Sequence, residues 1–281
     1  MKLAVACLIA FGSLHAWAQE KIQWTDVTQW GVEGRGWGDQ DRARWFDRFP
    51  AKAEGAVTPA VWNLSRHSAG MMVRFKTDAT EIHARWKLMS ARLGMPHMPP
   101  SGVSGLDLYA RDTQGQWRWA AATRPSKQDM QAALLRGIAP GLREYAVYLP
   151  LYNGTESLSI GIPAGAKFEG LAPRKAKPLV FYGTSITHGA CASRPGITHP
   201  AILGRRFDRP VINIGFSGNG RMHEAVGKLM AEVDAACYII DCLPNMNAAM
   251  VAERCVPLVK LLRKARPETP IVLVEDRRFA N

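Results

Sequence analysis

Four short, mostly apolar runs in the last third of the chain limit its fold more than any other feature. They cover residues 179–182, 210–215, 237–240 and 271–274, and segments with helical spacing lie between them at 200–207, 223–232 and 250–264. Apolar strands that alternate with helices predict a parallel α/β sheet covered on both faces. Ligands bind to such sheets at the carboxyl ends of the strands. We therefore expect functional residues in the loops that begin at Gly183, Gly215 and Asp241.

The first part of the chain follows a different pattern. Strand candidates with partial alternation of apolar and polar residues recur at 71–75, 82–86, 106–110, 117–121, 144–149 and 158–162. Clusters of Gly, Pro, Asp and Asn separate them, which predicts a β-sandwich or jelly-roll domain over residues 19–172. A short Pro- and Lys-rich linker at 173–178 is the best domain boundary, and the α/β domain is expected at 179–281.

Residues 1–18 contain the parts of a secretory signal peptide in their usual order. A positive start at Lys2 is followed by a mostly apolar run over 3–14 and by Ala-Trp-Ala at 16–18. The apolar run is shorter than the ~20 residues that a transmembrane helix needs. We expect cleavage before Gln19 and an exported protein, secreted or periplasmic, without a membrane anchor. A buried N-terminal helix is the alternative interpretation.

Composition and charge exclude several classes of protein and of partner. With 47% hydrophobic and 21% charged residues, the chain of 281 residues is globular rather than disordered, collagenous or coiled-coil. Its formal net charge of +12 favours acidic surfaces through long-range attraction. The basic residues are scattered and no nucleic-acid-binding motif is present, so we expect a solvated basic surface and no nucleic-acid partner.

Four cysteines remain once Cys7 is removed with the signal peptide: Cys191, Cys237, Cys242 and Cys255. Export would permit disulfides, and the sequence does not choose between the possible pairings. Cys237 and Cys242 are separated by an odd number of residues on a strand candidate, so their side chains should point to opposite faces. No Cys/His spacing resembles a zinc site, and the sequence predicts no metal and no cofactor.

Three residues at the expected ligand-binding edge could act together in acyl transfer. Ser185 follows the first apolar run, where it can present a nucleophilic hydroxyl and its own N–H to one cavity. Gly218 lies after the second run, where a backbone N–H can approach a ligand closely. Asn245 follows the third run and could offer its side-chain amide. Each residue alone is as typical of an ordinary turn, but three adjacent strand ends together indicate a catalytic site.

The same segments resemble a known family. The first three sequence blocks of the SGNH (GDSL-like) hydrolase superfamily are similar, in order, to Gly-Thr-Ser at 183–185, Gly-Phe-Ser-Gly at 215–218 and Pro-Asn at 244–245. The GxDLY signature of a β-domain that precedes one subgroup of these hydrolases resembles Gly-Leu-Asp-Leu-Tyr at 105–109, and segment 143–154 is similar to the same domain. The resemblance covers most of the chain and includes both domains in the right order.

The resemblance implies a flavodoxin-like α/β domain of three layers and a serine esterase. Ser185 would be the nucleophile, and the N–H groups of Ser185 and Gly218 with the amide of Asn245 would form the oxyanion hole. Members with this architecture are mostly esterases that often deacetylate carbohydrates or related small esters. Thr184 stands where Gly-Asp-Ser has its aspartate, and Leu-Pro-Asn-Met at 243–246 stands where many members have Gly-x-Asn-Asp.

One block of the family pattern is missing. That block is Asp-x-x-His near the C-terminus, whose histidine activates the serine, and no aspartate of this chain has a histidine three residues later. We therefore expect a C-terminally incomplete α/β domain and a chain that is weakly active or inactive alone. His188, His199 and His223 are expected to border the pocket or to be structural rather than to replace that base.

Five further residues have less specific expected roles. Asp107 and Tyr109 are expected to be structural in their strand. Trp117 and Trp119 lie two residues apart and should share one strand face, which we expect to pack in the core between two sheets rather than to bind sugar. Arg194 would either contact an acidic substrate or hold its own loop.

Together these features predict an exported SGNH-type esterase that acts through a Ser185 acyl-enzyme. Its substrate would be a small-molecule or carbohydrate ester with a short acyl group, above all acetyl. A non-catalytic carbohydrate-binding or remnant protein is the alternative from a different class. A thioesterase or peptidase that uses the same site is the third interpretation, and the oligomeric state is left open.

Overall fold

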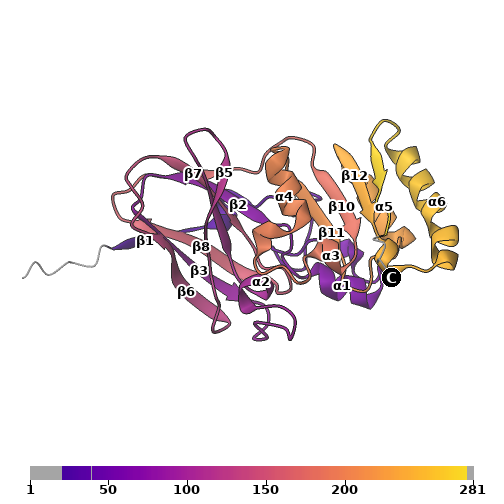
Figure 1. Cartoon of the computed structure of the whole chain (residues 1–281), viewed down its shortest axis with the longest axis horizontal. Helices are drawn as coiled ribbons and strands as arrows, with labels where there is room; N and C mark the ends of the chain where they lie inside the picture. Colours follow the sequence, from indigo (N-terminus) through magenta and orange to yellow (C-terminus); the bar gives the residue numbers. More distant parts are fainter. Residues whose placement is uncertain (1–20, 39, 277–281) are drawn as a thin grey trace, which may run out of the picture.

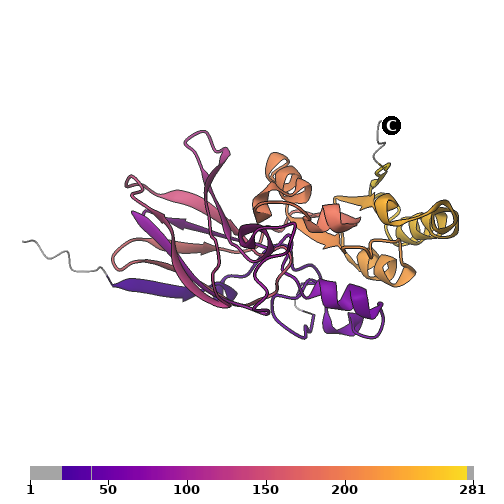
Figure 2. The same ribbon diagram turned by 60° about the horizontal axis from the view of Figure 1, so that its bottom comes forward.

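The computed structural model describes residues 21–38 and 40–276, so the predicted signal peptide lies outside the described residues. An all-β part and an α/β part lie end to end (Figures 1 and 2). Strands β1 to β9 build the first part, and strands β10 to β13 build the second together with the longer helices. The predicted fold, a β-sandwich followed by a parallel α/β sheet, is confirmed.

Two antiparallel sheets form the all-β part. One has the order β1 (Ile22–Asp26), β8 (Thr155–Pro163), β3 (Glu81–Leu88), β6 (Asp129–Arg136), and the other β5 (Trp117–Ala122), β4 (Asp107–Arg111), β7 (Arg143–Tyr148), β2 (Met72–Thr77), β9 (Phe168–Leu171). Alternate residues of β3, namely Ile82, Ala84, Trp86 and Leu88, are buried, as the period of two of a strand requires. They pack with residues of the other sheet such as Val147, which makes one apolar layer between the sheets.

Three strands of the sandwich were not expected from the sequence. They are β1, β6 and β9. The β6 sequence, Asp-Met-Gln-Ala-Ala-Leu-Leu-Arg, has no β-branched residue, so its local preference does not favour a strand. Pairing with β3 gives β6 its extended conformation, and pairing with β2 does the same for the four-residue β9.

The α/β part contains one parallel sheet. Its strand order is β11 (Val211–Gly215), β10 (Leu179–Gly183), β12 (Cys237–Asp241), β13 (Ile271–Leu273). The longer helices are α4 (His199–Arg206), α5 (Glu224–Glu232) and α6 (Ala248–Ala265), and the short ones α1 (Pro59–Ser65), α2 (Pro100–Val103) and α3 (Ser185–His188). Strand β11 is buried along its whole length, as expected for a strand covered on both faces.

Residues between the first two strands of the sandwich, β1 and β2, complete the α/β core. Trp37 and Trp62 belong to the same apolar cluster as Val180 of the parallel sheet. The indole Nε1 of Trp37 also donates a hydrogen bond to the carbonyl of Leu229 in α5, at 3.2 Å. Helix α1 accordingly lies next to the α/β part in Figure 1. The two parts therefore share a core, and more than a linker joins them.

Charged side chains fasten the junction between the two parts. The buried carboxylate of Glu33 lies 2.7 Å from Nη2 of Arg174 and 3.2 Å from Nη1 of Arg74. Asp208 of the α/β part accepts from both Arg174 and Arg111 at 2.9 Å. Because Glu33 is shielded from solvent, salt screens these pairs less than surface pairs. The network therefore holds the two parts in one orientation.

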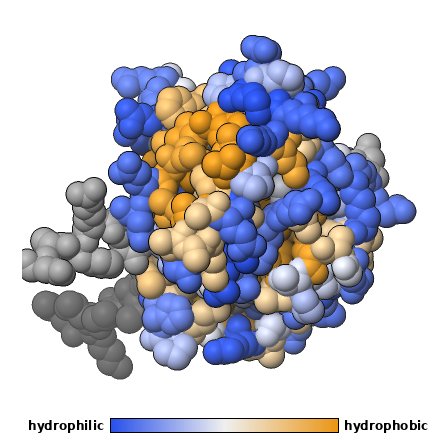
Figure 3. All heavy atoms as spheres, turned by 90° about the vertical axis from the view of Figure 1, so that its right-hand side faces the viewer, coloured by the Kyte–Doolittle hydropathy of each residue, from blue (hydrophilic) through white to orange (hydrophobic). Residues whose placement is uncertain are grey.

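Strand β13 is an edge strand with an exposed apolar surface. Val272, Leu273 and, on α6, Val256 are each about half exposed. Figure 3 shows apolar side chains gathered on the face at this end of the molecule. Unpaired backbone and exposed apolar groups on an edge strand favour pairing with another chain.

The expected core position of Trp117 and Trp119 is wrong. Trp119 is 54% exposed, and its Nε1 donates to Oδ1 of Asp107 at 3.0 Å. Trp117 lies under the guanidinium of Arg111, 4.4 Å from the ring centre. The two tryptophans do share a face, but it is the outer face of the sheet. The period of two shows which residues share a face, whereas only the packing of the other sheet decides which face points inward.

The cysteines Cys191, Cys237, Cys242 and Cys255 are all free thiols. Cys191 is exposed and Cys242 is buried. Burial raises the pKa of the Cys242 thiol to about 12, so this group is protonated at neutral pH and unreactive as a nucleophile.

Candidate active site

Parallel strand pairing brings the three predicted site segments to one edge of the sheet. Gly183 lies opposite Gly215 on one side and opposite Asp241 on the other. The segments that leave these positions carry Ser185, Gly218 and Asn245 respectively. Because the strands are parallel, all three segments emerge at the same carboxyl edge, as the sequence predicted.

Ser185 begins the single-turn helix α3. The Thr184 side chain caps this helix, since its Oγ1 accepts a hydrogen bond from the Ile186 N–H at 3.3 Å. Gly189 ends the helix with φ +120°, a left-handed conformation that favours glycine. Ser185 is half-buried, so its hydroxyl lies at a surface that a substrate can reach. The threonine that replaces the family aspartate therefore has a local role as a cap.

Backbone hydrogen bonds hold the second segment against the first. The Phe216 N–H donates to the Gly183 carbonyl at 3.0 Å, and Asn219 and Gly220 donate to the Phe216 carbonyl at 2.8 and 2.9 Å. Gly218 is exposed at the tip of this turn with φ +70°, and the space on its side-chain position is open. Its N–H is therefore close to the strand end without being enclosed by the protein.

Asn245 ends a 3₁₀ turn that follows β12. Its backbone N–H donates to the Cys242 carbonyl at 3.0 Å. Its side-chain Oδ1 is buried and has no hydrogen-bond partner within the described part of the chain. This oxygen can accept a hydrogen bond from a ligand, whereas the predicted oxyanion role would use the Nδ2 group of the same amide.

Side-chain hydrogen bonds connect helix α3 to both neighbouring strands. Thr187 Oγ1 donates to Oδ2 of Asp241 at 2.9 Å, and Asn213 Nδ2 donates to the Thr187 carbonyl at 2.7 Å. The Oδ1 of Asn213 accepts in turn from the Gly215 N–H at 2.8 Å. All of these groups are buried, so the helix that begins with Ser185 has a defined position above the sheet.

A buried cluster of aromatic rings lies beside the same helix. The rings of His188 and Tyr152 are stacked with centroids 4.1 Å apart, and His67 lies 5.4 Å from His188. The Tyr152 hydroxyl donates to the Ser185 carbonyl at 3.3 Å. Burial and the positive charge of Arg48 hold the pKa of His188 well below its usual range, so His188 is neutral at pH 7.

The histidines near the site have other partners than the serine hydroxyl. The carbonyl of Leu151 accepts from Nε2 of His188 at 2.7 Å. His199 packs edge-on against the Phe181 ring, and His223 precedes α5. Among residues 21–38 and 40–276, no histidine forms a hydrogen bond with the hydroxyl of Ser185. This arrangement agrees with the predicted bordering and structural roles.

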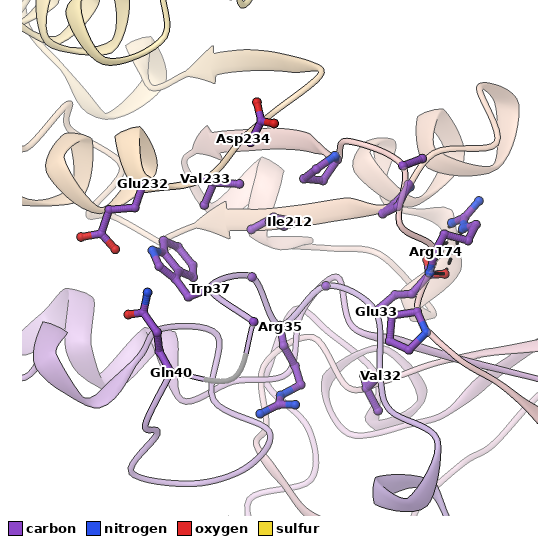
Figure 4. A pocket seen from close by; sticks show the side chains of 17 residues that line it. Val32, Glu33, Arg35, Trp37, Gln40, Arg174, Ile212, Glu232, Val233 and Asp234 are labelled. Atoms are coloured by element: carbon purple, nitrogen blue, oxygen red, sulfur yellow. Dashed lines mark hydrogen bonds and ion pairs between the residues drawn. The ribbon is translucent and has the colours of Figure 1, made fainter.

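Two of the cavities lie near the parallel sheet, at different positions. One of about 280 Å³ lies next to α3 and is lined by small residues such as Gly189, Ala190 and Ala192 and by the larger Ile186 and Ile197. A larger one, about 500 Å³, lies at the amino end of the sheet, between the loop at Trp37 and the residues that precede the strands (Figure 4). Only the smaller cavity borders the segment that begins with Ser185.

Asp107 connects the sandwich to the loop after Ser185. Its buried carboxylate accepts from the Gly196 N–H at 2.7 Å, and the guanidinium of Arg194 lies 3.5 Å away. Arg194 also lies over the Trp119 ring, 4.8 Å from its centre. Tyr109 is packed and 4% exposed. The structural roles expected for Asp107 and Tyr109 are confirmed, and Arg194 helps to hold its loop.

The pH dependence of stability should report on Asp107. Burial raises the pKa of this carboxyl from 3.8 to about 6, although Gly196, Arg194 and Trp119 oppose the shift. The folded state then binds the proton more tightly than the unfolded state, so the contribution of Asp107 falls as pH rises from 3.8 to about 6. We expect the difference in free energy of unfolding between wild type and Asp107→Asn to fall by at most about 3 kcal/mol across this window. Urea unfolding at a series of pH values measures it, and a difference independent of pH would contradict this assignment.

Sequence reasoning missed several residues that support the site. Arg48, Tyr152 and Asn213 all contact its segments, yet neither the resemblance of 143–154 nor the apolar run at 210–215 indicated these contacts. No periodicity or spacing could have identified them, because their contacts join positions far apart in the chain. The described residues include no group of His, Cys, Asp and Glu placed to hold a metal ion. None of the described helices has the length and apolar character needed to cross a membrane.

Comparison with protein families gives two matches that together cover most of the chain. Residues 176–281 match the GDSL-like lipase/acylhydrolase family. Residues 22–168 match GxDLY, the N-terminus of SGNH-hydrolase-type esterases. None of the curated proteins matches the chain significantly.

Solved structures similar to the chain include three with different names. A Bacteroides ovatus protein named a GDSL-like lipase is 31% identical, with a TM-score of 0.83 over 90% of this chain and 74% of that one. The salicylyl acyltransferase SsfX3 of a tetracycline biosynthetic pathway is 18% identical, with a TM-score of 0.69 over 89% and 71%. A family two carbohydrate esterase from Cellvibrio japonicus is 10% identical, with a TM-score of 0.61 over 93% and 81%. At these identities the last two show the fold alone.

Proposed function

The chain belongs to the GDSL-like lipase/acylhydrolase family and carries the N-terminal domain of SGNH-hydrolase-type esterases, and from this premise we propose that it is an exported serine esterase. The proposed substrates are short acyl esters, above all acetyl esters of carbohydrates. One observation carries the proposal: the segments with Ser185, Gly218 and Asn245 leave three paired strands at the same edge. Export rests on the order of residues in segment 1–18.

In the proposed reaction the Ser185 hydroxyl attacks the ester carbonyl. The C–O bond to serine forms, the carbonyl oxygen becomes an oxyanion, and the serine proton passes to a base or to water. The N–H groups of Ser185 and Gly218 and the amide of Asn245 donate to that oxyanion. Each such donor typically contributes about 3 kcal/mol of transition-state stabilisation. The alcohol then leaves with a proton, and water hydrolyses the acyl-enzyme.

A short acyl group is favoured by the cavity beside α3. Gly189, Ala190 and Ala192 line its small side, and larger side chains such as Ile186, the residue after Ser185, and Ile197 complete a volume of about 280 Å³. A volume of this size suits an acetyl group and part of an alcohol better than a long acyl chain. The carbohydrate esterase from Cellvibrio japonicus, which shares the fold, adds support for a sugar as the alcohol.

The alternative from another class is a non-catalytic carbohydrate-binding protein. What favours it is that no histidine of the described residues bonds to the Ser185 hydroxyl. A serine without a base is a weak nucleophile. A thioesterase or peptidase would use the same oxyanion donors, so only substrate preference separates it from an esterase.

A substrate panel tests the proposal. Acetylated xylose, a long-chain acyl ester of the same sugar, an acetyl thioester and an acetylated peptide amide are each incubated with the full chain. We expect acetate release from the sugar ester above the rate without protein, and slower release of the long acyl group because the cavity is small. Preference for the thioester or the amide would overturn the esterase assignment. Absence of release combined with binding of deacetylated xylan in calorimetry would support the carbohydrate-binding alternative.

A further inference from the structure

Arg48 is a buried cation without an acidic partner. Its residue is 2% exposed, and no carboxylate of the described residues lies within ion-pair distance of it. Burial lowers the pKa of its guanidinium to about 9, so Arg48 still carries its charge at neutral pH. A buried charge is costly unless hydrogen bonds replace its hydration. The partners of Arg48 therefore indicate what the charge does.

These partners are backbone carbonyls at the end of strand β11. Nη1 of Arg48 donates to the carbonyls of Asn213 and Gly215, both at 2.9 Å, and Nη2 donates to the Leu64 carbonyl at 2.6 Å. Among the strands of residues 21–38 and 40–276, β11 is an edge strand and pairs only with β10. Carbonyls two residues apart along a strand point the same way, and on the outer side no further strand is present to donate to them. The guanidinium takes the place of that strand.

The strand end that Arg48 holds is the start of the second site segment. Gly215 pairs with Gly183, and the next residue, Phe216, donates its N–H to the Gly183 carbonyl at 3.0 Å. Arg48 also lies over the Phe216 ring, 5.0 Å from its centre. Any shift of Gly215 would therefore move both the turn that carries Gly218 and the backbone just before Ser185.

The charge of Arg48 also acts electrostatically on the cluster of aromatic rings beside Ser185. It lowers the pKa of His67 and of His188, the latter three residues after Ser185. A positive charge in a low-dielectric site stabilises negative charge that develops nearby. Its field at this edge of the sheet favours an oxyanion, and its hydrogen bonds set the position of the donors.

We propose that Arg48, from the segment between sandwich strands β1 and β2, is a positioning residue of the esterase site. It holds the carboxyl end of β11, and with it the Gly218 turn, in the place where an oxyanion forms. This inference rests on the proposed function for its catalytic consequence. The structural consequence, that Arg48 holds the end of β11 in place, does not depend on the proposed function.

The test compares the full wild-type chain with Arg48→Gln and Arg48→Lys. Glutamine keeps one donor and removes the charge, whereas lysine keeps the charge and loses the forked geometry. Ethyl fluorophosphonate is the probe, and intact mass follows formation of its serine adduct. We expect Arg48→Gln to lower the maximal labelling rate about tenfold or more with little change in the half-saturating concentration, because the lost donors act on the transition state. Arg48→Lys should recover part of that rate.

Arg263→Gln is the matched control. Arg263 also donates to two backbone carbonyls, those of Pro267 and Thr269, but it is an exposed residue of α6, in the connection between β12 and β13. We expect wild-type labelling for this variant. A folded Arg48→Gln variant that is labelled at the wild-type rate would overturn the proposal. If Arg48→Gln does not fold, labelling of Arg48→Lys at the wild-type rate would overturn the proposal instead.

Amide hydrogen exchange separates this inference from the proposed function. The Phe216 and Gly220 N–H groups are hydrogen-bonded in the turn, so loss of Arg48 should speed their exchange, and loss of Arg263 should not. If wild type is not labelled but exchange changes as expected, the esterase proposal fails and the positioning role stands. If exchange is unchanged in Arg48→Gln, the positioning role fails whatever the labelling shows.

Discussion

Replacement of Ser185 by alanine is expected to abolish covalent labelling of the chain by a fluorophosphonate. In the wild type, the Ser185 oxygen would attack phosphorus, fluoride would leave, and the proton would pass to solvent. The position of Ser185 at the strand edge, half-buried and capped by Thr184, makes it the hydroxyl best placed to react. Intact mass spectrometry should show one adduct on the wild type and none on Ser185→Ala.

Labelling, rather than ester turnover, is the decisive measurement for Ser185. The effects of substitutions on rate are not additive for residues that act as one catalytic unit. Where no base is bound to the serine, removal of the serine therefore lowers ester turnover little further. With no histidine bonded to the hydroxyl among the described residues, the labelling rate should rise about tenfold per pH unit with no plateau near the ordinary pKa of imidazole. A plateau at or below pH ~6.5 would show that a resident histidine acts as base, because burial lowers the pKa of His188, His199 and His223.

Ser217→Ala is the control for this experiment. Ser217 precedes Gly218 in the second segment and is also half-buried, so it is the competing hydroxyl at the same edge. We expect the Ser217→Ala variant to be labelled as the wild type is. An adduct that survives in Ser185→Ala and disappears in Ser217→Ala would assign the nucleophile to the other serine.

Replacement of Gly220 by alanine should disrupt the site through sterics alone. A Cβ at Gly220 would overlap the Gly183 carbonyl and would lie 2.8 Å from the Thr184 nitrogen. Both neighbours are backbone atoms of the strand-to-helix turn before Ser185, so neither can rotate away. We expect a loss of about 3 kcal/mol or more in the free energy of unfolding, measured by urea denaturation, and a much reduced labelling rate.

Gly115→Ala separates overlap from backbone strain. Gly115 has φ +75°, which favours glycine, but nothing lies within 4 Å of a Cβ placed there. Its replacement should cost only about 1 kcal/mol and leave labelling unchanged, since the turn that contains it is in the sandwich. Equal stability losses for the two variants would mean that the close approach of Gly220 to Gly183 is not required for folding.

The sheet edge that carries the candidate site could be predicted because its signals are local in sequence. A parallel strand ends where its apolar run ends, so the position of Ser185 after 179–182 followed from the run itself. The same holds for Gly218 and Asn245. Supporting residues could not be predicted in this way, because Arg48 and Tyr152 reach the site across more than thirty residues each.

Which face of a strand points into the core could not be predicted from the sequence either. The spacing of Trp117 and Trp119 predicted that they share a face, and they do. That this face is the outer one depends on where the second sheet packs, a fact that no local pattern contains. Strand β6 is similar, because its extended conformation comes from pairing with β3 and not from its own residues.

By itself, the sequence determined the two fold classes, their order in the chain and the three strand ends that carry the site. These follow from periodicity, turn residues and apolar runs, which act over a few residues. Only the tertiary structure decided that residues such as Trp37 and Trp62 complete the α/β core, that Asp107 anchors the Gly196 loop, and that Arg48 takes the place of a strand beside β11. The reason is physical: a buried charge or an unpaired carbonyl must find its partner wherever the folded chain brings one close.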